Sequence, residues 1–255
     1  MTEKFHLFLQ LLKAVSFSVV VFYSSGCSDA PIDYRKEMED RIKSDRQLGR
    51  DYAEKFEQQV VILNDIESTD YLRSLVRKLI SHADDLSISD SAAGVYLIED
   101  KSHTLRCFGF PGVRLYVSVG ILKIIDYESA LAALLAFELG RIQARHFVKN
   151  LEKIKPQELV QSLSNDAFFD YTSKEGSDPV KYAVKMMYDS GYDPRGLVSY
   201  LNLLQNNPMR TPLTSKTLKY LSEATFDEIS SYPPLIRPLS KTDGFIKLKR
   251  KYFKN

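Results

Sequence analysis

Apolar residues recur at helical spacing in the first third of the chain. Leu48, Tyr52, Phe56 and Val60 lie four residues apart, which predicts an amphipathic helix through this stretch. A second helix follows, because apolar residues continue there at spacings of three and four residues, as in a stripe that buries one helix face. This stripe consists of Leu72, Leu75, Val76, Leu79 and Ile80.

The pattern changes between residues 95 and 118. Residues 95–98, 105–110 and 114–118 are short runs rich in β-branched and aromatic residues, and turn signals stand between them at residues 100–102 and at Pro111-Gly112. Short strands joined by such turns predict a small antiparallel sheet.

Helical patterns then dominate again. Residues 121–125 begin a helix, and residues 127–149 are long enough to form the central one. Residues 179–190 predict a helix that stops at residues 191–194, and residues 198–204 predict another. With 255 residues, of which 44% are hydrophobic, the chain can bury one core. We expect an α+β fold: one mainly helical domain over residues 44–240, with the small antiparallel sheet next to the central helix.

The first 27 residues have the layout of a secretion signal. An apolar run at residues 14–23 follows Lys4 and Lys13, and it ends in small residues directly before Cys27, which resembles a bacterial lipobox. We expect a signal peptide over 1–27, lipidation of Cys27, and a tether with the start of the first helix over 28–43. An uncleaved anchor that extends upstream is the alternative. Both place the domain on the periplasmic face of a bacterial cell envelope, membrane-anchored, and Ser28 favours the outer membrane.

The charge balance excludes a nucleic-acid partner. The chain has 35 basic and 33 acidic residues, a formal charge of +2, and no basic stripe interleaved with aromatic residues. Residues 241–255 carry a basic run, which we expect to be a solvated tail; contact with anionic lipid is the alternative.

Residues 131–147 are similar to a zinc-protease helix that has lost its histidines. In the motif H-E-x-x-H, two imidazoles one turn apart hold Zn²⁺, and the glutamate between them is the general base. Here Phe137 and Arg141 stand at the two histidine positions, and only Glu138 remains. This replacement raises the question of whether the chain is a peptidase at all.

An ordered set of segments resembles the gluzincin metallopeptidases of family M forty-eight, and it covers about residues 44–237. The set consists of residues 48–50, 110–122, 128–136, 145–146 and 186–194. The resemblance implies that the third zinc ligand corresponds to Asp178, that an aspartate two residues later has become Val180, and that a later histidine has become Tyr232. Every imidazole that the family uses is therefore missing.

The remaining residues predict no metal and no cofactor. Glu138 and Asp178 offer at most two carboxylates, whereas catalytic zinc takes three protein ligands, and Arg141 adds a charge that is not lost by deprotonation. Glu138 and Arg141 are neighbours on one helix face. We therefore expect a Glu138–Arg141–Asp178 ion network in place of the metal, and a catalytically inactive Glu138. The alternative is that Arg141 is a surface residue beside Phe137.

The same resemblance implies a cleft in which an extended polypeptide pairs with a sheet edge. The edge corresponds to Arg106, Cys107 and Phe108. We expect a catalytically inactive metallopeptidase-like envelope lipoprotein that binds extended or unfolded polypeptide, as a scaffold or chaperone in envelope quality control. Two alternatives stay open: a divergent zinc metalloendopeptidase with other ligands, and a purely structural envelope lipoprotein.

Overall fold

A computed structural model describes residues 34–83, 87–88, 93–99, 107–163, 178–207, 211 and 213–253, with only the backbone of Glu152. The predicted signal peptide, the predicted lipidation site Cys27 and the predicted edge residue Arg106 lie outside these residues. The chain divides into two units, Met1–Asp40 and Arg41–Asn255. The second unit holds the sheet and all the predicted site residues that the structure describes.

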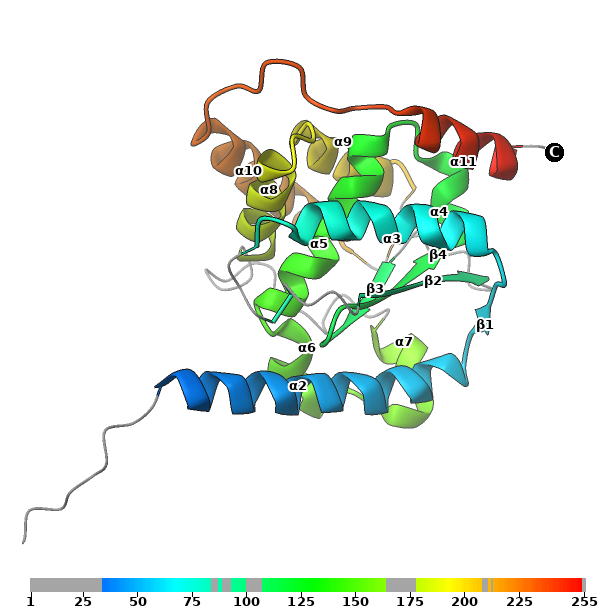
Figure 1. The fold of residues 1–255 in the computed structure, drawn as a ribbon, viewed down its shortest axis with the longest axis vertical. Coiled ribbons are helices and arrows are strands. Elements are labelled where there is room, and N and C mark those ends of the chain that lie inside the picture. Colours follow the sequence, from blue (N-terminus) through cyan, green and yellow to red (C-terminus); the bar gives the residue numbers. More distant parts are fainter. Residues whose placement is uncertain are drawn as a thin grey trace, which may run out of the picture. The chain divides into compact units, whose positions relative to one another are not determined.

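The sheet has four strands in the order β1-β2-β4-β3 (Figure 1). Their bounds are β1 Val61–Ile62, β2 Gly94–Glu99, β3 Cys107–Phe110 and β4 Arg114–Ser118. The pairs β1/β2 and β3/β4 are antiparallel, whereas β2 and β4 run parallel, with Val95 opposite Leu115. The α+β class is confirmed. The prediction that the sheet is antiparallel is wrong, because β2 pairs with β4 and not with its neighbour in sequence.

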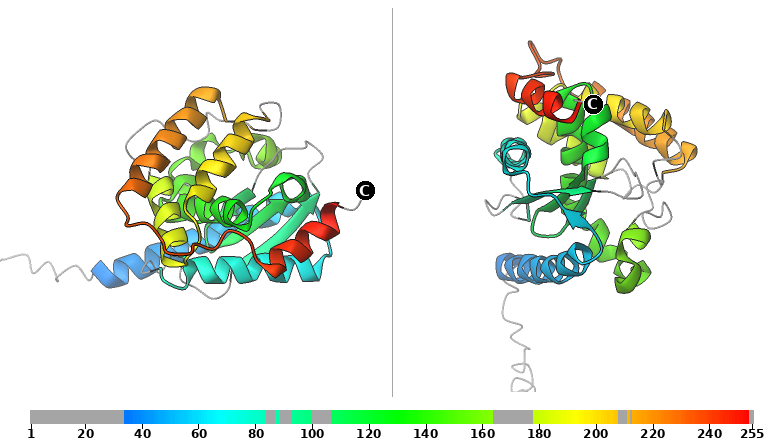
Figure 2. Two further views of the ribbon diagram at one scale, coloured as in Figure 1. Left: turned by 90° about the horizontal axis from the view of Figure 1, so that it is seen from above. Right: turned by 90° about the vertical axis from the view of Figure 1, so that its right-hand side faces the viewer.

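Helices cover both faces of this sheet. Residues of α2 (Tyr34–Glu57) from Arg41 onward lie on one face, and α3 (Ile66–Ile80) lies on the other (Figures 1 and 2). Phe56 of α2 packs on the rings of Phe108, Phe110 and Tyr116, with centroid distances of 4.9–5.5 Å. All five residues of the stripe predicted for α3 are buried, so that prediction is confirmed.

The central helix α5 (Glu128–Gln143) is buried from Glu128 to Ile142. It packs mainly against α8 (Asp178–Asp189) and α9 (Arg195–Gln205), and one side contacts β3. The prediction of one helix over 127–149 is wrong at its end. Arg145 has a left-handed backbone with φ 57°, and a separate helix, α6, begins after it. The Arg145 guanidinium donates to both carboxylate oxygens of Asp45 on α2, at 2.6 and 2.9 Å, and this pair holds the break in place.

The other elements are α4 (Val119–Ile124), α6 (His146–Lys149), the 3₁₀ turns Leu151–Lys153 and Pro156–Glu158, α7 (Leu159–Leu163), α10 (Ser215–Ser230) and α11 (Asp243–Phe253). The helix stop predicted at residues 191–194 is confirmed: Gly191 has φ 74°, and α9 begins at Arg195, directly after Pro194.

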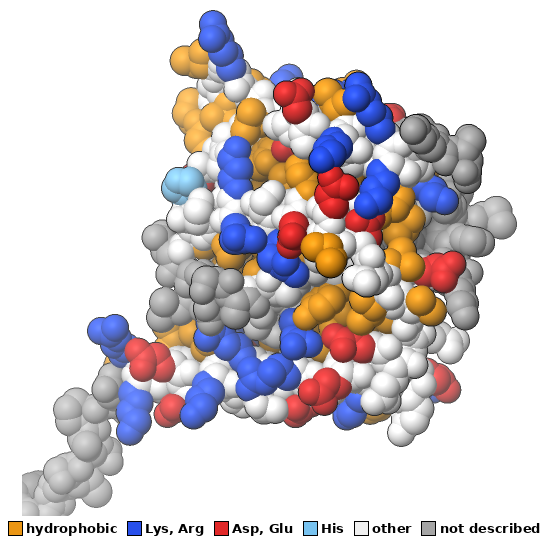
Figure 3. Space-filling view, turned by 45° about the vertical axis from the view of Figure 1, so that its right-hand side comes forward, with side chains coloured by type: hydrophobic (Ala, Val, Ile, Leu, Met, Phe, Trp, Pro, Cys, Tyr) orange, Lys and Arg blue, Asp and Glu red, His pale blue; other side chains and the backbone are white. Residues whose placement is uncertain are grey.

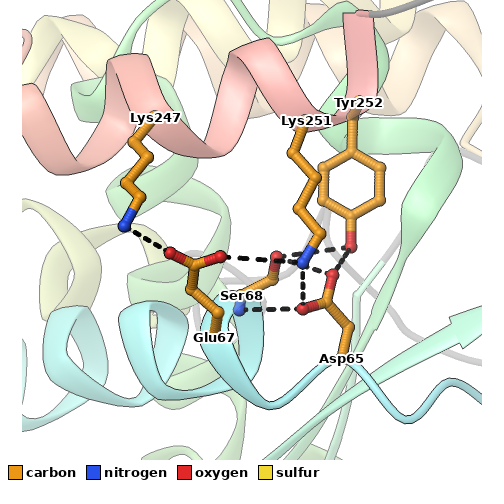
Figure 4. A network of polar contacts seen from close by, with 6 residues as sticks. All are labelled: Asp65, Glu67, Ser68, Lys247, Lys251 and Tyr252. Atoms are coloured by element: carbon orange, nitrogen blue, oxygen red, sulfur yellow. Dashed lines mark hydrogen bonds and ion pairs between the residues drawn. The ribbon is translucent and has the colours of Figure 1, made fainter.

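The solvated tail expected over 241–255 is wrong for residues 243–253, which form α11. This helix is fixed to the first turn of α3 by a polar network (Figure 4). The Lys251 ammonium lies 2.6 Å from the carboxylate of Asp65, which caps α3, and the Lys247 ammonium lies 2.5 Å from Glu67. Phe245 and Leu248 of α11 are buried. The many lysines of this segment suggest a solvated tail. Two of them, Lys247 and Lys251, instead pair with acidic residues at the start of α3, which is distant in the sequence.

The surface in Figure 3 shows Lys and Arg side chains interspersed with Asp and Glu side chains, as the balanced composition leads one to expect. Within the part of the chain that the structure describes, no helix has the length and hydrophobicity needed to cross a membrane.

Candidate functional site

Glu138 and Arg141 form a buried ion pair on α5. The Arg141 Nη1 donates to Glu138 Oε1 at 2.7 Å, and the two side chains are only 8% and 5% exposed. Isolated charges at such depth cost several kcal/mol each, and the attraction of a hydrogen-bonded partner offsets part of this cost. The alternative of a surface arginine is therefore wrong.

The second oxygen of Glu138 faces the sheet. A side-chain carbon added to Gly109 of β3 would lie 3.3 Å from Glu138 Oε2, so this oxygen lies next to the strand. Within the described part of the chain, Oε2 is buried and has no hydrogen-bond partner. A buried acceptor of this kind is unusual in folded proteins.

Asp178 lies at the first residue of α8, close to the centre of α5. The two helices come together at Gly140, where an added side-chain carbon would lie 2.6 Å from the carbonyl oxygen of Pro179. Asp178 itself is 34% exposed, and its carboxylate lies 3.8 Å from the Lys181 ammonium on its own helix. Among the described residues, no ion pair joins it to Arg141. The third arm of the predicted network is therefore not formed.

The aromatic residues at the other lost histidine positions lie in different places. Phe137 is 4% exposed and belongs to the hydrophobic core, as does Val180. Tyr232 stacks on Tyr188, with ring centroids 4.8 Å apart. Since Tyr188 follows Asp178 by ten residues of α8, the two lie about 15 Å apart along the helix. Tyr232 therefore packs near the end of α8 that is opposite to Asp178.

The residues at the implied zinc position do not fit the ion. Phe137 has no donor atom, Arg141 brings a fixed positive charge, and the carboxylates of Glu138 and Asp178 already pair with cations. Among the described residues, no three His, Cys, Asp or Glu side chains come together as a metal site. The loss of zinc remains a prediction to be tested by metal analysis.

The predicted edge corresponds to the last strand of the sheet as described. β3 pairs with β4 and ends the strand order opposite to β1. The side chains of Cys107 and Phe108 are buried, and the Phe108 ring packs on Phe56 at 5.1 Å. Recognition of a polypeptide at this strand would therefore use backbone groups, because these two side chains belong to the core.

Sequence reasoning missed a second buried carboxylate, Glu128, at the other end of α5. Glu128 is 1% exposed and accepts hydrogen bonds from the Tyr192 hydroxyl at 2.9 Å and from the Thr242 hydroxyl. Burial, with the nearby Glu128 charge, raises the pKa of Tyr192. The carboxylate ties α5 to the turn before α9 and to the segment before α11. An acidic residue at the start of an otherwise apolar helix was the available signal.

Comparison with known proteins finds a distant sequence similarity to a group of proteases. No family profile matches it. The chain is 21% identical over 189 residues to the β-barrel assembly-enhancing proteases of Escherichia coli K12, Shigella flexneri and Escherichia coli O157:H7. The alignment covers 64% of this chain and 38% of the length of each relative. This distant similarity agrees with a relationship to metallopeptidases.

Proposed function

We propose that this protein is a metallopeptidase-like component of the cell envelope that has lost zinc and peptide cleavage and that binds extended polypeptide. The buried Glu138–Arg141 pair carries the proposal. The resemblance implies that Glu138 corresponds to the general base and Arg141 to a zinc ligand. A general base must be able to accept a proton from water at the reacting centre. Here the Glu138 carboxylate instead pairs with the Arg141 guanidinium on the same helix.

Electrostatics support the loss of zinc. A guanidinium a few ångströms from a dication would repel it by several kcal/mol even at an effective dielectric constant of about 20. The two nitrogen ligands that would offset this repulsion are absent, because Phe137 and Arg141 replace them.

The sheet order supports the binding of polypeptide. A terminal strand can accept an extended segment through its backbone groups, and specificity then comes from neighbouring side chains. Among the strands that the structure describes, β3 stands at one end of the order, and the buried Glu138 Oε2 lies beside it. The name of the relatives refers to β-barrel assembly, and a β-barrel is built from strands. The leader with Cys27 at its end would hold the domain at the membrane.

Metal analysis tests the loss of chemistry. The purified protein is expected to carry no zinc above background and to cleave no unfolded casein. A matched variant, F137H/R141H, restores both imidazoles one turn apart around Glu138 and is expected to gain zinc that a chelator removes. Stoichiometric zinc in the wild-type protein, with cleavage that stops on chelation, would sink the proposal and favour the divergent peptidase.

Hydrogen exchange tests the binding of polypeptide. Reduced, carboxymethylated lactalbumin serves as the unfolded partner, and the amides of β3 are expected to gain protection when it is present. The opposite end strand, β1 (Val61–Ile62), provides the internal control and is expected not to change. Protection that spreads equally over both ends, or that is absent at β3, would contradict strand addition and favour a purely structural role.

A further inference from the structure

Helix α11 lies between two cavities of similar size that differ in charge balance. The first, about 420 Å³, is on the side of α3, and its two lysines, Lys247 and Lys251, pair with Glu67 and Asp65 (Figure 4). The second, about 470 Å³, is on the side of the connection between α4 and α5. The charges of the first cavity are thus satisfied within the protein.

The charges of the second cavity are not balanced. Lys241, Lys249 and Arg250 line it, and Asp126 is the acidic residue among its lining residues. Lys249 donates to the carbonyl oxygens of Leu122, Lys123 and Ile125, so its ammonium attaches α11 to the end of α4. Lys241, Arg250 and Asp126 make no ion pair with any residue that the structure describes.

Three cations and one carboxylate line this cavity. Burial lowers the pKa of Lys249, the negative charge of Asp126 opposes this shift, and the smaller effect of the positive charge of Lys241 adds to it. A bound anion would be favoured here, because it would place negative charge beside two ammonium groups and one guanidinium, which outnumber the single carboxylate of Asp126. Lys241 and Arg250 are exposed, so their charged groups can reach such an anion.

The remaining wall is apolar and aromatic. Phe245 is buried at 1% exposure, and Ile246 lies next to it on α11. Tyr127 is 52% exposed, and the Lys241 ammonium lies 5.4 Å from the centroid of its ring. The cavity therefore offers cations and an apolar surface within one space. Its volume falls in the range of small-molecule sites, roughly 300–1,000 Å³.

We propose that this cavity binds an amphiphilic anion, in which a phosphate group is carried on an apolar or aromatic body. Arg250 and Lys241 contact the phosphate, since a guanidinium matches phosphate oxygens through two parallel N–H groups. Ile246 and the exposed part of the Tyr127 ring contact the apolar body. A membrane phospholipid and a soluble phosphate ester share this chemistry.

Calorimetric titration of the full-length protein tests the proposal and separates the two sources. Dihexanoyl-phosphatidylglycerol, below its micelle concentration, represents the lipid, and phenyl phosphate represents the soluble ester. One of them is expected to bind saturably at one site, at least about tenfold more tightly than dihexanoyl-phosphatidylcholine or inorganic phosphate. The tighter of the two identifies the source.

Paired variants locate the binding. K241A/R250A removes two exposed cations from the cavity and is expected to weaken binding at least about tenfold. K216A/K219A removes two exposed cations from α10 and is expected to bind as the wild type does, with both variants folded by circular dichroism. Unchanged affinity in K241A/R250A, or an equal loss in K216A/K219A, would overturn the proposal. Inorganic phosphate that binds as tightly as both amphiphiles would reduce the site to an adventitious ion only.

Discussion

At the scale of single residues, the Glu138–Arg141 pair is the most consequential feature of the site. In Arg141→Met, the Glu138 carboxylate stays buried at 5% side-chain exposure without its guanidinium. We expect a loss of about 3 kcal/mol in the free energy of unfolding. E138L/R141M removes both charges and is expected to recover most of the lost stability. Apolar side chains of similar volume often replace a buried ion pair without loss of stability. Urea denaturation gives both values.

The control for this prediction is Lys219→Met. Lys219 lies 3.8 Å from Glu223 on the exposed face of α10, and such surface pairs contribute about 0–1 kcal/mol. If the free energy of unfolding of Arg141→Met lies within 1 kcal/mol of the wild-type value, the pair is not desolvated as the structure describes.

Sequence spacing predicts contacts within one helix better than contacts between helices. Glu138 and Arg141 meet because residues three apart share a helix face. Asp178 has an equally near partner in Lys181, three residues away, and takes it in place of the more distant Arg141. The assignment of Tyr232 depends on a short motif, and such a motif does not encode which helix its residues will pack against.

At the scale of helices, the approach of α5 to α8 depends on Gly140. Alanine at this position would gain about 1 kcal/mol in helix propensity. Its side-chain carbon, however, would lie 2.6 Å from the backbone oxygen of Pro179, so the helices must move apart. We expect Gly140→Ala to lose about 2 kcal/mol net, measured by thermal denaturation. At Gly191, an added side-chain carbon would have no atom within 4 Å. Gly191→Ala should therefore lower the free energy of unfolding by only about 1 kcal/mol, because alanine is strained at a φ of +74°. A stabilised Gly140→Ala would disprove this packing.

The attachment of α11 to α3 through Asp65 makes the stability of the fold depend on pH. Burial raises the pKa of Asp65, but hydrogen bonds from Lys251, Tyr252 and Ser68 outweigh it and hold the pKa below its usual value of 3.8. The ionised group therefore stabilises the fold above about pH 4, and this contribution is lost as the pH falls toward the folded pKa. In Asp65→Asn, capping of α3 is kept while the ion pair is lost.

Melting temperatures between pH 7 and pH 3 measure this effect. The difference between the wild type and Asp65→Asn is expected to be largest at pH 7 and to shrink as the pH falls below 4. Glu223→Gln, on α10, provides the control and should show the same dependence of the melting temperature on pH as the wild type. A difference that stays constant over this range would contradict a role for the ionised Asp65.

Most helices could be predicted from periodicity, and the exceptions have physical reasons. The apolar stripe of α3 is continuous, so its burial could be predicted from the sequence. The end of α5 could not, because Arg145 takes a left-handed backbone that a distant partner, Asp45, holds in place. The parallel pairing of β2 with β4 also depends on the path between strands, which their composition does not encode.

At the scale of the whole molecule, the C-terminal segment is part of the core and not an appendage. Thr242 donates to the buried Glu128, Phe245 and Leu248 are buried, and Lys249 contacts the carbonyl oxygens at the end of α4. Burial of one Phe or Leu contributes about 1.5–3 kcal/mol. We therefore expect deletion of residues 241–255 to lower the melting temperature by about 10 °C or more, since 1 kcal/mol corresponds to about 2–4 °C in a domain of this size. Deletion of residues 254–255 alone, which lie outside the described part, should leave it unchanged. A 241–255 deletion that melts within 2 °C of the full chain would mean that the segment behaves as the solvated tail that its composition suggests.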